Sequence, residues 1–128
     1  MTLRVFKTLD FQDFVKDEGL TEEVLWKAIA EVERGLVDAR LGGFLIKKRV
    51  PRPGGGKSGG YRTIMAHRQG ERIFLLYGFA KNERANITPA ERAALLLAGD
   101  AYMKLSDAEL DTAVVKKVLL ELKAKKAN

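Results

Sequence analysis

Residues 41–81 read LGGFLIKKRVPRPGGGKSGGYRTIMAHRQGERIFLLYGFAK, and this stretch decides the fold. Three runs rich in apolar and β-branched side chains predict strands, at residues 44–50, 61–68 and 72–80. The ten residues from Pro51 to Gly60 include five glycines and two prolines, which predict a long loop between the first two strands. Gln69 and Gly70 predict a tight turn before the third strand. The third strand is apolar on both faces, so we expect it inside a sheet that is covered from both sides.

Basic side chains are concentrated on these strands and on the loop between them. From residue 47 to residue 72 there are eight lysines or arginines and one acid, Glu71. The basic residues are Lys47, Lys48, Arg49, Arg52, Lys57, Arg62, Arg68 and Arg72. Because the apolar residues of the strands would hold these cations in fixed positions, the pattern predicts a surface that binds a polyanion. RNA is the polyanion that we expect.

The segment before this region predicts one more strand and two helices. Residues 2–6 alternate apolar and polar side chains, which predicts a strand that joins the sheet at its edge. A short helix, capped by Thr8 or Asp10 and ended by Gly19, comes next. A longer helix then starts at Thr21, and its apolar residues recur at helical spacing.

Two capping boxes predict the helices of the C-terminal part. The first, from Thr88 to Glu91, starts a helix that runs to about residue 105. The second, from Ser106 to Glu109, starts a last helix. The apolar stripe of this last helix is Leu110, Val114, Val118 and Leu122.

The order of these elements predicts an α+β fold. We expect a mainly antiparallel sheet packed against two N-terminal helices, with C-terminal helices after it. A chain of 128 residues has room for one hydrophobic core, so we expect a single domain over residues 1–128. Its core would lie at about residues 2–92, and a C-terminal helical extension would cover about residues 88–125.

The composition narrows the classes of partner and of site. The chain has 23 lysines and arginines against 17 acids, and the net charge of +6 favours nucleic acid, an anionic membrane or an acidic protein as partner. The absence of cysteine excludes disulfides and thiolate ligands, and with a single histidine we expect no metal site and no cofactor. No run approaches the ~20 apolar residues of a membrane span, so we expect a soluble, cytoplasmic protein without a membrane partner.

The glycine loop matches a nucleotide-binding phosphate loop only in part. That motif needs a glycine six residues before its lysine and a helix directly after it. Here Pro51 stands six residues before Lys57, and a predicted strand follows, so we expect no ATP or GTP site. Glycines still let a backbone approach a phosphate closely, and we expect the loop to contact phosphate. The single histidine, His67, lies at the far end of its strand, which favours a structural or surface role.

Cations from two distant stretches are predicted to meet at one end of the sheet. Because the second and third strands of the region are antiparallel, the end of the third returns beside the start of the second. Lys81 and Arg84 would then lie near Tyr61, Arg62 and the glycine loop. This arrangement would place cations around a single phosphate.

Two motifs resemble those of a known family. The sequence SGGYR at residues 58–62 and FAKNER at residues 79–84 resemble the RelE/HigB-type toxins of bacterial type II toxin–antitoxin modules. The loop PGGGKSGGYR and the segment YGFAKNERANIT are most similar to a HigB-like branch of this RelE/ParE superfamily. The resemblance covers roughly residues 2–92.

The resemblance implies a fold, an activity and a mechanism. The fold would be compact and similar to that of microbial ribonucleases. The protein would enter the A site of the 30S ribosomal subunit and act there as a ribosome-dependent mRNA endoribonuclease that inhibits translation. Its chemistry would be attack by the RNA 2′-hydroxyl on the neighbouring phosphate, without a metal ion, with cations stabilising the charge that develops.

The resemblance also assigns roles to residues. Arg62 would bind the scissile phosphate, Arg84 would stabilise the transition state or the leaving oxygen, and Lys57 would complete the catalytic set. The residues expected to bind RNA are Lys47, Lys48, Arg49, Arg52, Tyr61 and Lys81. Lys57 or Lys48 could act as the base, since nearby cations lower the pKa of a lysine. Some family members carry a tyrosine a few residues past the second motif, at the place where this chain has Thr88. Either lysine and arginine alone support the chemistry here, or another side chain takes the role of that tyrosine. The candidates are Tyr61, Tyr77 and His67.

The family implies partners, and other functions remain open. The expected partners are a cognate antitoxin, often a helix-turn-helix repressor, together with the ribosome and mRNA. The alternatives are a basic nucleic-acid-binding protein without ribonuclease activity, a gyrase inhibitor like the ParE branch, and a regulatory subunit whose basic face binds only another protein.

Overall fold

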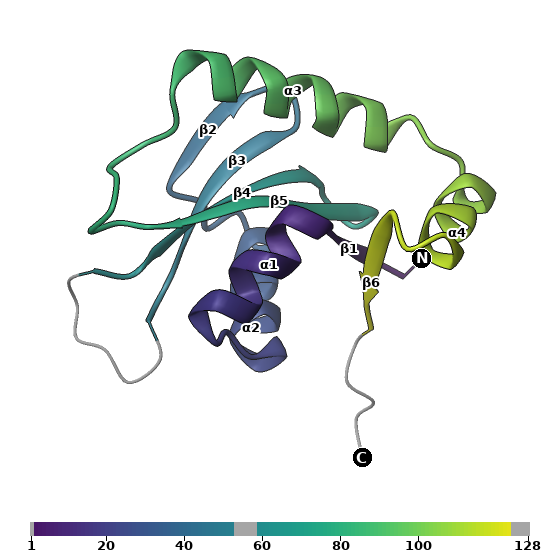
Figure 1. Ribbon diagram of the computed structural model, residues 1–128. Helices are drawn as coiled ribbons and strands as arrows, with labels where there is room; N and C mark the ends of the chain where they lie inside the picture. The colour runs from purple at the N-terminus through teal and green to yellow at the C-terminus, as the bar shows by residue number, and fades with distance from the viewer. Residues whose placement is uncertain (1, 53–58, 124–128) are drawn as a thin grey trace.

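The computed structural model describes residues 2–52 and 59–123, and it has the predicted α+β architecture (Figure 1). The elements in chain order are β1 (Arg4–Thr8), α1 (Leu9–Glu18), α2 (Glu22–Glu33), β2 (Ala39–Gly42), β3 (Leu45–Val50), β4 (Tyr61–Arg68), β5 (Arg72–Ala80), α3 (Pro89–Met103), α4 (Asp107–Val115) and β6 (Leu119–Leu122). The three strands predicted around the glycine loop are β3, β4 and β5. None of the helices in these described ranges has the length and apolar character needed to cross a membrane.

The strands form a single six-stranded sheet in the order β2-β3-β4-β5-β1-β6. The pairing of β1 with β5 is parallel, and the other neighbouring strands are antiparallel, which confirms the prediction of a mainly antiparallel sheet. The prediction that the N-terminal strand lies at the edge is wrong. β1 lies between β5 and β6, because a C-terminal segment returns to pair with its other side.

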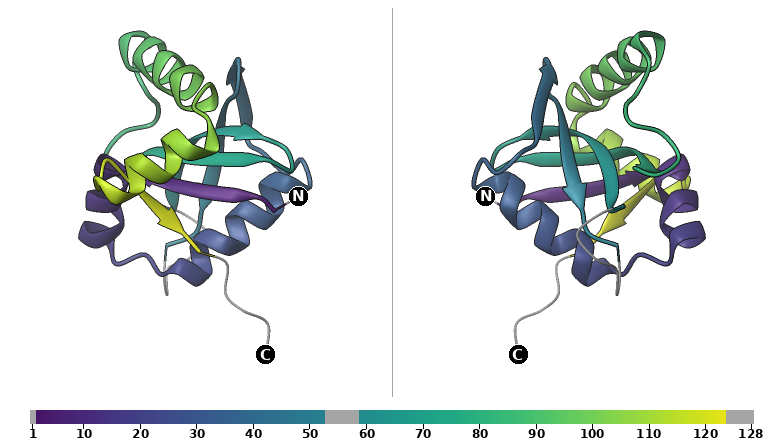
Figure 2. Two further views of the ribbon diagram at one scale, coloured as in Figure 1. Left: turned by 90° about the vertical axis from the view of Figure 1, so that its right-hand side faces the viewer. Right: turned by 90° about the vertical axis from the view of Figure 1, so that its left-hand side faces the viewer.

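Helices cover both faces of the sheet, as Figure 2 shows. On one face, α1 and α2 bury Phe11, Leu25 and Ile29 against the sheet, as their helical spacing predicts. On the other face, α3 and α4 bury Met103 and Leu110. Strand β5 is therefore covered from both sides, and this confirms the interpretation of its continuous apolar run.

Local sequence signals set the helix ends. The side-chain oxygens of four N-cap residues each accept a hydrogen bond from a backbone N–H of the first turn, and these residues are Thr8, Thr21, Thr88 and Ser106. Both predicted capping boxes are present. Gly19 ends α1 in the left-handed region, at φ 68°. His67 has a structural role, because its Nε2 lies 2.6 Å from Glu33 Oε2 and joins β4 to the end of α2.

The last predicted helix is wrong beyond Val115. Lys117 adopts φ 60°, a conformation that ends a helix, and the chain then forms β6 beside β1. The spacing of the apolar residues also suits a helix, but pairing decides the outcome, because β1 would otherwise present an unpaired edge. Arg4 of β1 fixes the position of β6 through hydrogen bonds to both carboxylate oxygens of Glu121, at 3.0 and 2.9 Å.

Two substitutions distinguish the strand from the predicted helix. Leu122 of β6 is buried (3% exposed), whereas Val118, which precedes β6, is 53% exposed. We expect Leu122→Ala to lower the free energy of unfolding by roughly 2–5 kcal/mol and Val118→Ala by less than about 0.5 kcal/mol. Urea denaturation measures both losses. Similar losses for the two variants would indicate a continuous helical stripe and contradict the strand.

Candidate functional site

Three predicted cations lie on the face of the sheet that α3 covers. Strand alternation places Lys47 and Arg49 of β3 on the same side as the core residue Leu45. Arg62 of β4 lies on the same side as Ile64. Arg49 and Arg62 are direct partners across the β3–β4 pair, so their side chains emerge next to each other.

This arginine pair is unfavourable unless an anion joins it. Like charges directly opposite each other on a sheet destabilise it. Arg62 is only 8% exposed, and within residues 2–52 and 59–123 neither Arg62 nor Arg49 has a side-chain hydrogen bond or ion pair. Two adjacent guanidinium groups without a carboxylate, one of them largely buried, suit a site for a phosphate.

A bulge in β5 brings Arg84 to the same face. The register with β4 shifts between Ile64 and Met65, so β5 contains one extra residue there. Beyond the bulge, Phe79 is the direct partner of Arg62 and shares its face. The guanidinium carbon of Arg84 lies 5.4 Å from the centre of the Phe79 ring. Arg62 and Phe79 therefore share a face, and the guanidinium of Arg84 lies over the Phe79 ring.

The close approach of α1 fixes the same part of β5. Gly78 lies between two residues of the α3 face and so points toward α1. A Cβ atom at this position would lie 2.5 Å from the Phe14 ring, so only glycine fits. Just after the end of β5, the backbone N–H of Lys81 donates to Gly60 O at 3.1 Å. The segment that carries Lys81 and Arg84 is thus held to the base of the glycine loop, at the end of the sheet seen on the left of Figure 1.

Arg84 is held by several acceptors. Its Nη1 donates to Glu91 Oε2 at 3.0 Å, and its Nη2 donates to the other oxygen of the same carboxylate. Nη1 also donates to the Tyr77 hydroxyl at 3.2 Å, and Nε donates to Asn86 O at 3.0 Å. The hydrogen bond from Arg84 and that from the Thr88 backbone lower the pKa of Glu91 to about 2. The same carboxylate raises the pKa of Arg84.

Three of the predicted RNA-binding residues lie on the opposite face, toward α1 and α2. The ammonium of Lys48 pairs with Glu31 at 3.0 Å and donates to Leu36 O at 2.8 Å, so it joins β3 to α2. The Tyr61 ring is 2% exposed and packs edge-on against Phe14. In this position the ring is not available to stack on a base.

Arg52, the third of these residues, belongs to the start of the glycine loop. Its guanidinium lies 5.5 Å from the centre of the Tyr61 ring, and its Nε donates to the tyrosine hydroxyl at 3.4 Å. Lys57 lies outside the described residues. The described ends of the loop are closely packed, because a Cβ on Gly60 would lie 3.0 Å from Val50 O.

The candidates for the general acid and base are also separated by the fold. His67 lies at the other end of β4 and pairs with Glu33, and Tyr61 is buried on the α1 face. Tyr77 points to the α3 face, and its hydroxyl accepts a hydrogen bond from Arg84. Sequence reasoning missed Glu91 as a partner of Arg84. The available signal was the capping box, which places a carboxylate at a fixed position seven residues after Arg84.

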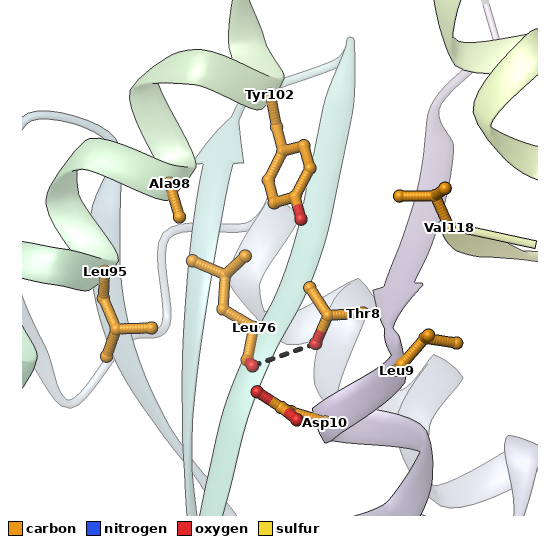
Figure 3. A pocket seen from close by; sticks show the side chains of 8 residues that line it. All are labelled: Thr8, Leu9, Asp10, Leu76, Leu95, Ala98, Tyr102 and Val118. Atoms are coloured by element: carbon orange, nitrogen blue, oxygen red, sulfur yellow. Dashed lines mark hydrogen bonds between the residues drawn. The ribbon is translucent and has the colours of Figure 1, made fainter.

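The surrounding hollows limit where a phosphate could bind. One hollow lies between α3 and the β1–α1 junction, where Thr8 Oγ1 donates to Leu76 O (Figure 3). Its volume is about 310 Å³. Its lining is mostly apolar, and Asp10 is the charged residue in it, so it lacks the cation that a phosphate needs. A second hollow, of about 500 Å³, includes Arg84 but is lined by acids of α1 and by Glu83. Within the described ranges, no group of three or more histidine, aspartate or glutamate side chains could hold a metal ion.

A comparison with protein families identifies the chain. The model of the family described as "RelE toxin of RelE / RelB toxin-antitoxin system" matches residues 3–122. The chain belongs to this family. It is therefore a toxin of a toxin–antitoxin system, and toxins of this family pair with an antitoxin and generally cleave mRNA. The family match extends past residue 92, where the resemblance of the sequence motifs ends, and it includes α3, α4 and β6 of this RelE-family toxin. A search of curated proteins found no match.

The ion pair between Arg84 and Glu91 predicts how the stability of the fold depends on pH. Folding lowers the pKa of Glu91 from 4.5 to about 2, so the pair stabilises the fold above pH 4.5, and this contribution is lost as the pH falls through about 2. In Arg84→Ala the pKa should move back toward 4.5, although the Thr88 hydrogen bond will keep part of the shift. An NMR titration of the side-chain carboxyl carbon measures this value.

Glu109 provides the internal control for that titration. Its pKa is lowered by the backbone and side-chain hydrogen bonds of Ser106, in a capping box without an arginine. Its titration should therefore be the same in both proteins. An unchanged Glu91 titration in Arg84→Ala would show that the arginine does not hold this carboxylate in solution.

Proposed function

We propose that this RelE-family toxin is a ribosome-dependent mRNA endoribonuclease of the HigB-like type. The observation that carries this proposal is the arrangement of arginines around Phe79. Arg49 and Arg62 are adjacent across two strands, and within the described residues their guanidinium groups lack a carboxylate partner. The guanidinium of Arg84 lies over the Phe79 ring. Such an array suits a phosphate that gains negative charge during a reaction.

The proposed reaction needs no metal ion. The 2′-oxygen of the nucleotide before the cut attacks the adjacent phosphorus, and the bond from phosphorus to the 5′-oxygen of the next nucleotide breaks. A base accepts the proton of the 2′-hydroxyl, and an acid donates a proton to the leaving 5′-oxygen, so the products are a 2′,3′-cyclic phosphate and a 5′-hydroxyl. The phosphate oxygens gain charge in the transition state, and fixed cations stabilise them there more than in the substrate.

We assign the steps to residues by their places on the α3 face. Arg62 binds the scissile phosphate, and Arg84 donates to the oxygen that becomes negative. Lys57, from the glycine loop, contributes a further cation or the base. Tyr77 is the proton-transfer candidate that lies beside Arg84, through its hydroxyl.

The rest of the mRNA contacts the basic side of this face. Lys47, Arg49 and Lys81 bind the RNA backbone, whereas the acids of α1 beside Arg84 repel it. The RNA is therefore directed toward β3 and away from α1. Lys48 and Arg52 lie on the other face, where Lys48 pairs with Glu31 and Arg52 donates to the Tyr61 hydroxyl.

The partners follow from the proposed activity. The toxin acts in the cytoplasm at the A site of the 30S subunit, where it meets mRNA. Its cognate antitoxin is a helix-turn-helix repressor that covers the cationic face or prevents entry to the ribosome.

One observation favours a second function. Both Nη atoms of Arg84 already donate to Glu91, and an arginine whose charge is paired stabilises a developing negative charge less well than a free one. The alternative is therefore a basic nucleic-acid-binding protein or a ParE-like gyrase inhibitor without ribonuclease activity.

Primer extension on translating ribosomes separates these functions. The wild-type toxin should produce cuts in the A-site codon, and Arg62→Ala should reduce the cleavage rate by roughly 10²–10³-fold, because it removes a transition-state contact. Arg68→Ala is the matched control, since Arg68 lies on the same strand and face but contacts Phe44 at the far end. Intact transcripts together with DNA damage would favour the gyrase inhibitor, and cuts that persist in Arg62→Ala would contradict the site.

The salt dependence of RNA binding tests the proposed path of the RNA across the protein. If Arg49 contacts one phosphate of a single-stranded RNA, Arg49→Ala should lower the slope of log K against log salt by about 0.7. Lys104→Ala is the control, because Lys104 ends α3 and its side chain is 78% exposed. Fluorescence anisotropy with a labelled RNA oligonucleotide measures both slopes. Equal slopes for Arg49→Ala and the wild type would exclude Arg49 from the RNA path.

A further inference from the structure

The hydrogen bonds of Arg84 leave it one free donor. A guanidinium carries five N–H groups. Four of the five meet acceptors: one on Nε with Asn86 O, two on Nη1 with Tyr77 and Glu91, and one on Nη2 with Glu91. Within the described residues, the second N–H of Nη2 has no acceptor. Arg84 as observed can therefore offer one hydrogen bond in one direction.

The backbone of Arg84 does not belong to a regular element that would fix the orientation of its guanidinium. It lies between β5 and α3, in a segment without a helix or a strand. The rings of Tyr77 and Phe79 limit the plane of the guanidinium, at 6.0 and 5.4 Å from its carbon. Rotation within that plane is fixed by the two-oxygen pairing with Glu91.

Glu91, in contrast, is attached to a rigid part of the fold. It is the third residue of α3, where its Oε1 accepts a hydrogen bond from the Thr88 N–H at 2.8 Å. The next residue, Arg92, donates to Leu41 O of β2 at 2.9 and 2.6 Å. Further along α3, a Cβ on Gly99 would lie 3.0 Å from the Ala66 Cβ of β4. The carboxylate is therefore fixed relative to the strands that carry Arg49 and Arg62.

We propose that Glu91 is a positioning residue for Arg84 in the proposed cleavage reaction. It holds the guanidinium so that the remaining Nη2 N–H meets the phosphate oxygen that becomes negative in the transition state. This inference rests on the proposed function and adds to it a residue that does not touch the substrate. A carboxylate beside a phosphate weakens ground-state binding, so its presence here suits a site built for geometry rather than for affinity.

The second capping box shows that the pairing is not needed for capping. In α4, the Ser106 N–H donates to Glu109 Oε1 at 2.8 Å, and the Glu109 N–H donates to Ser106 Oγ at 3.0 Å. This is the same arrangement as at α3, and it forms without an arginine. The contact of Glu91 with Arg84 is an additional function of the same side chain.

This pair of capping boxes gives a matched experiment. Glu91→Gln keeps an acceptor for the cap but removes the charge and one of the two oxygens that hold Arg84. Glu109→Gln makes the same change in α4. Turnover of mRNA on programmed ribosomes gives kcat and KM for each variant, and thermal unfolding gives the melting midpoint.

We expect Glu91→Gln to lower kcat by roughly 10–100-fold, since a misplaced catalytic group costs rate. KM should stay the same or fall, because the carboxylate that repels the phosphate is removed, whereas Glu109→Gln should retain the wild-type kcat and KM. The melting midpoint should fall below that of Glu109→Gln, because only Glu91→Gln also loses an ion pair. In an Arg84→Ala background, Glu91→Gln should cause no further loss, because the two residues act as a unit.

Glu91→Asp tests geometry separately from charge, and it also serves if Glu91→Gln does not fold. It retains the negative charge but withdraws the carboxylate by one methylene, so kcat should again fall while KM stays the same. A wild-type kcat in both Glu91 variants would overturn the inference and leave the proposed function intact. A higher rate in Glu91→Gln would also overturn it, because Glu91 would then only compete with the phosphate for Arg84. A wild-type protein that cleaves no mRNA would overturn the proposed function and this inference with it.

Discussion

The register between β4 and β5 is the constraint on which the candidate site depends. A strand alternates its side chains between two faces, so a shift of one residue moves every later side chain to the other face. The bulge opposite Ile64 and Met65 makes this shift once. It turns Phe79 toward α3 and Gly78 toward Phe14 of α1. Without the extra residue, Arg62 would face a glycine, and Arg84 would have no ring to lie over.

The fold tolerates an unfavourable arrangement of charge at this site. Arg49 and Arg62 repel each other across the β3–β4 pair, and burial of Arg62 adds a cost of desolvation. The same strands bury apolar residues on both faces along the rest of their length, and this burial supplies the compensating stability. Repulsion that is relieved when a phosphate binds favours the bound state, so the cost to stability contributes to recognition.

The site also depends on α3, a helix that follows the strands around the glycine loop in the chain. α3 begins just after Arg84, and its first turn supplies the carboxylate that fixes the arginine. The family match includes α3, α4 and β6 together with the strands. Pairing of β6 with β1 adds the last strand to the sheet and connects the C-terminal part to the N-terminal strand.

The sequence alone determined the strands around the glycine loop, the helix caps and the concentration of cations, because these follow from short-range patterns of apolar, capping and charged residues. Tertiary structure decided the rest. It turned Lys48 toward α2, buried Tyr61 against Phe14 and made residues 119–122 a strand, because each outcome depends on a partner far away in the sequence. The pairing of Arg84 with Glu91 belongs to this second group, since it requires that α3 turn back toward the end of β5.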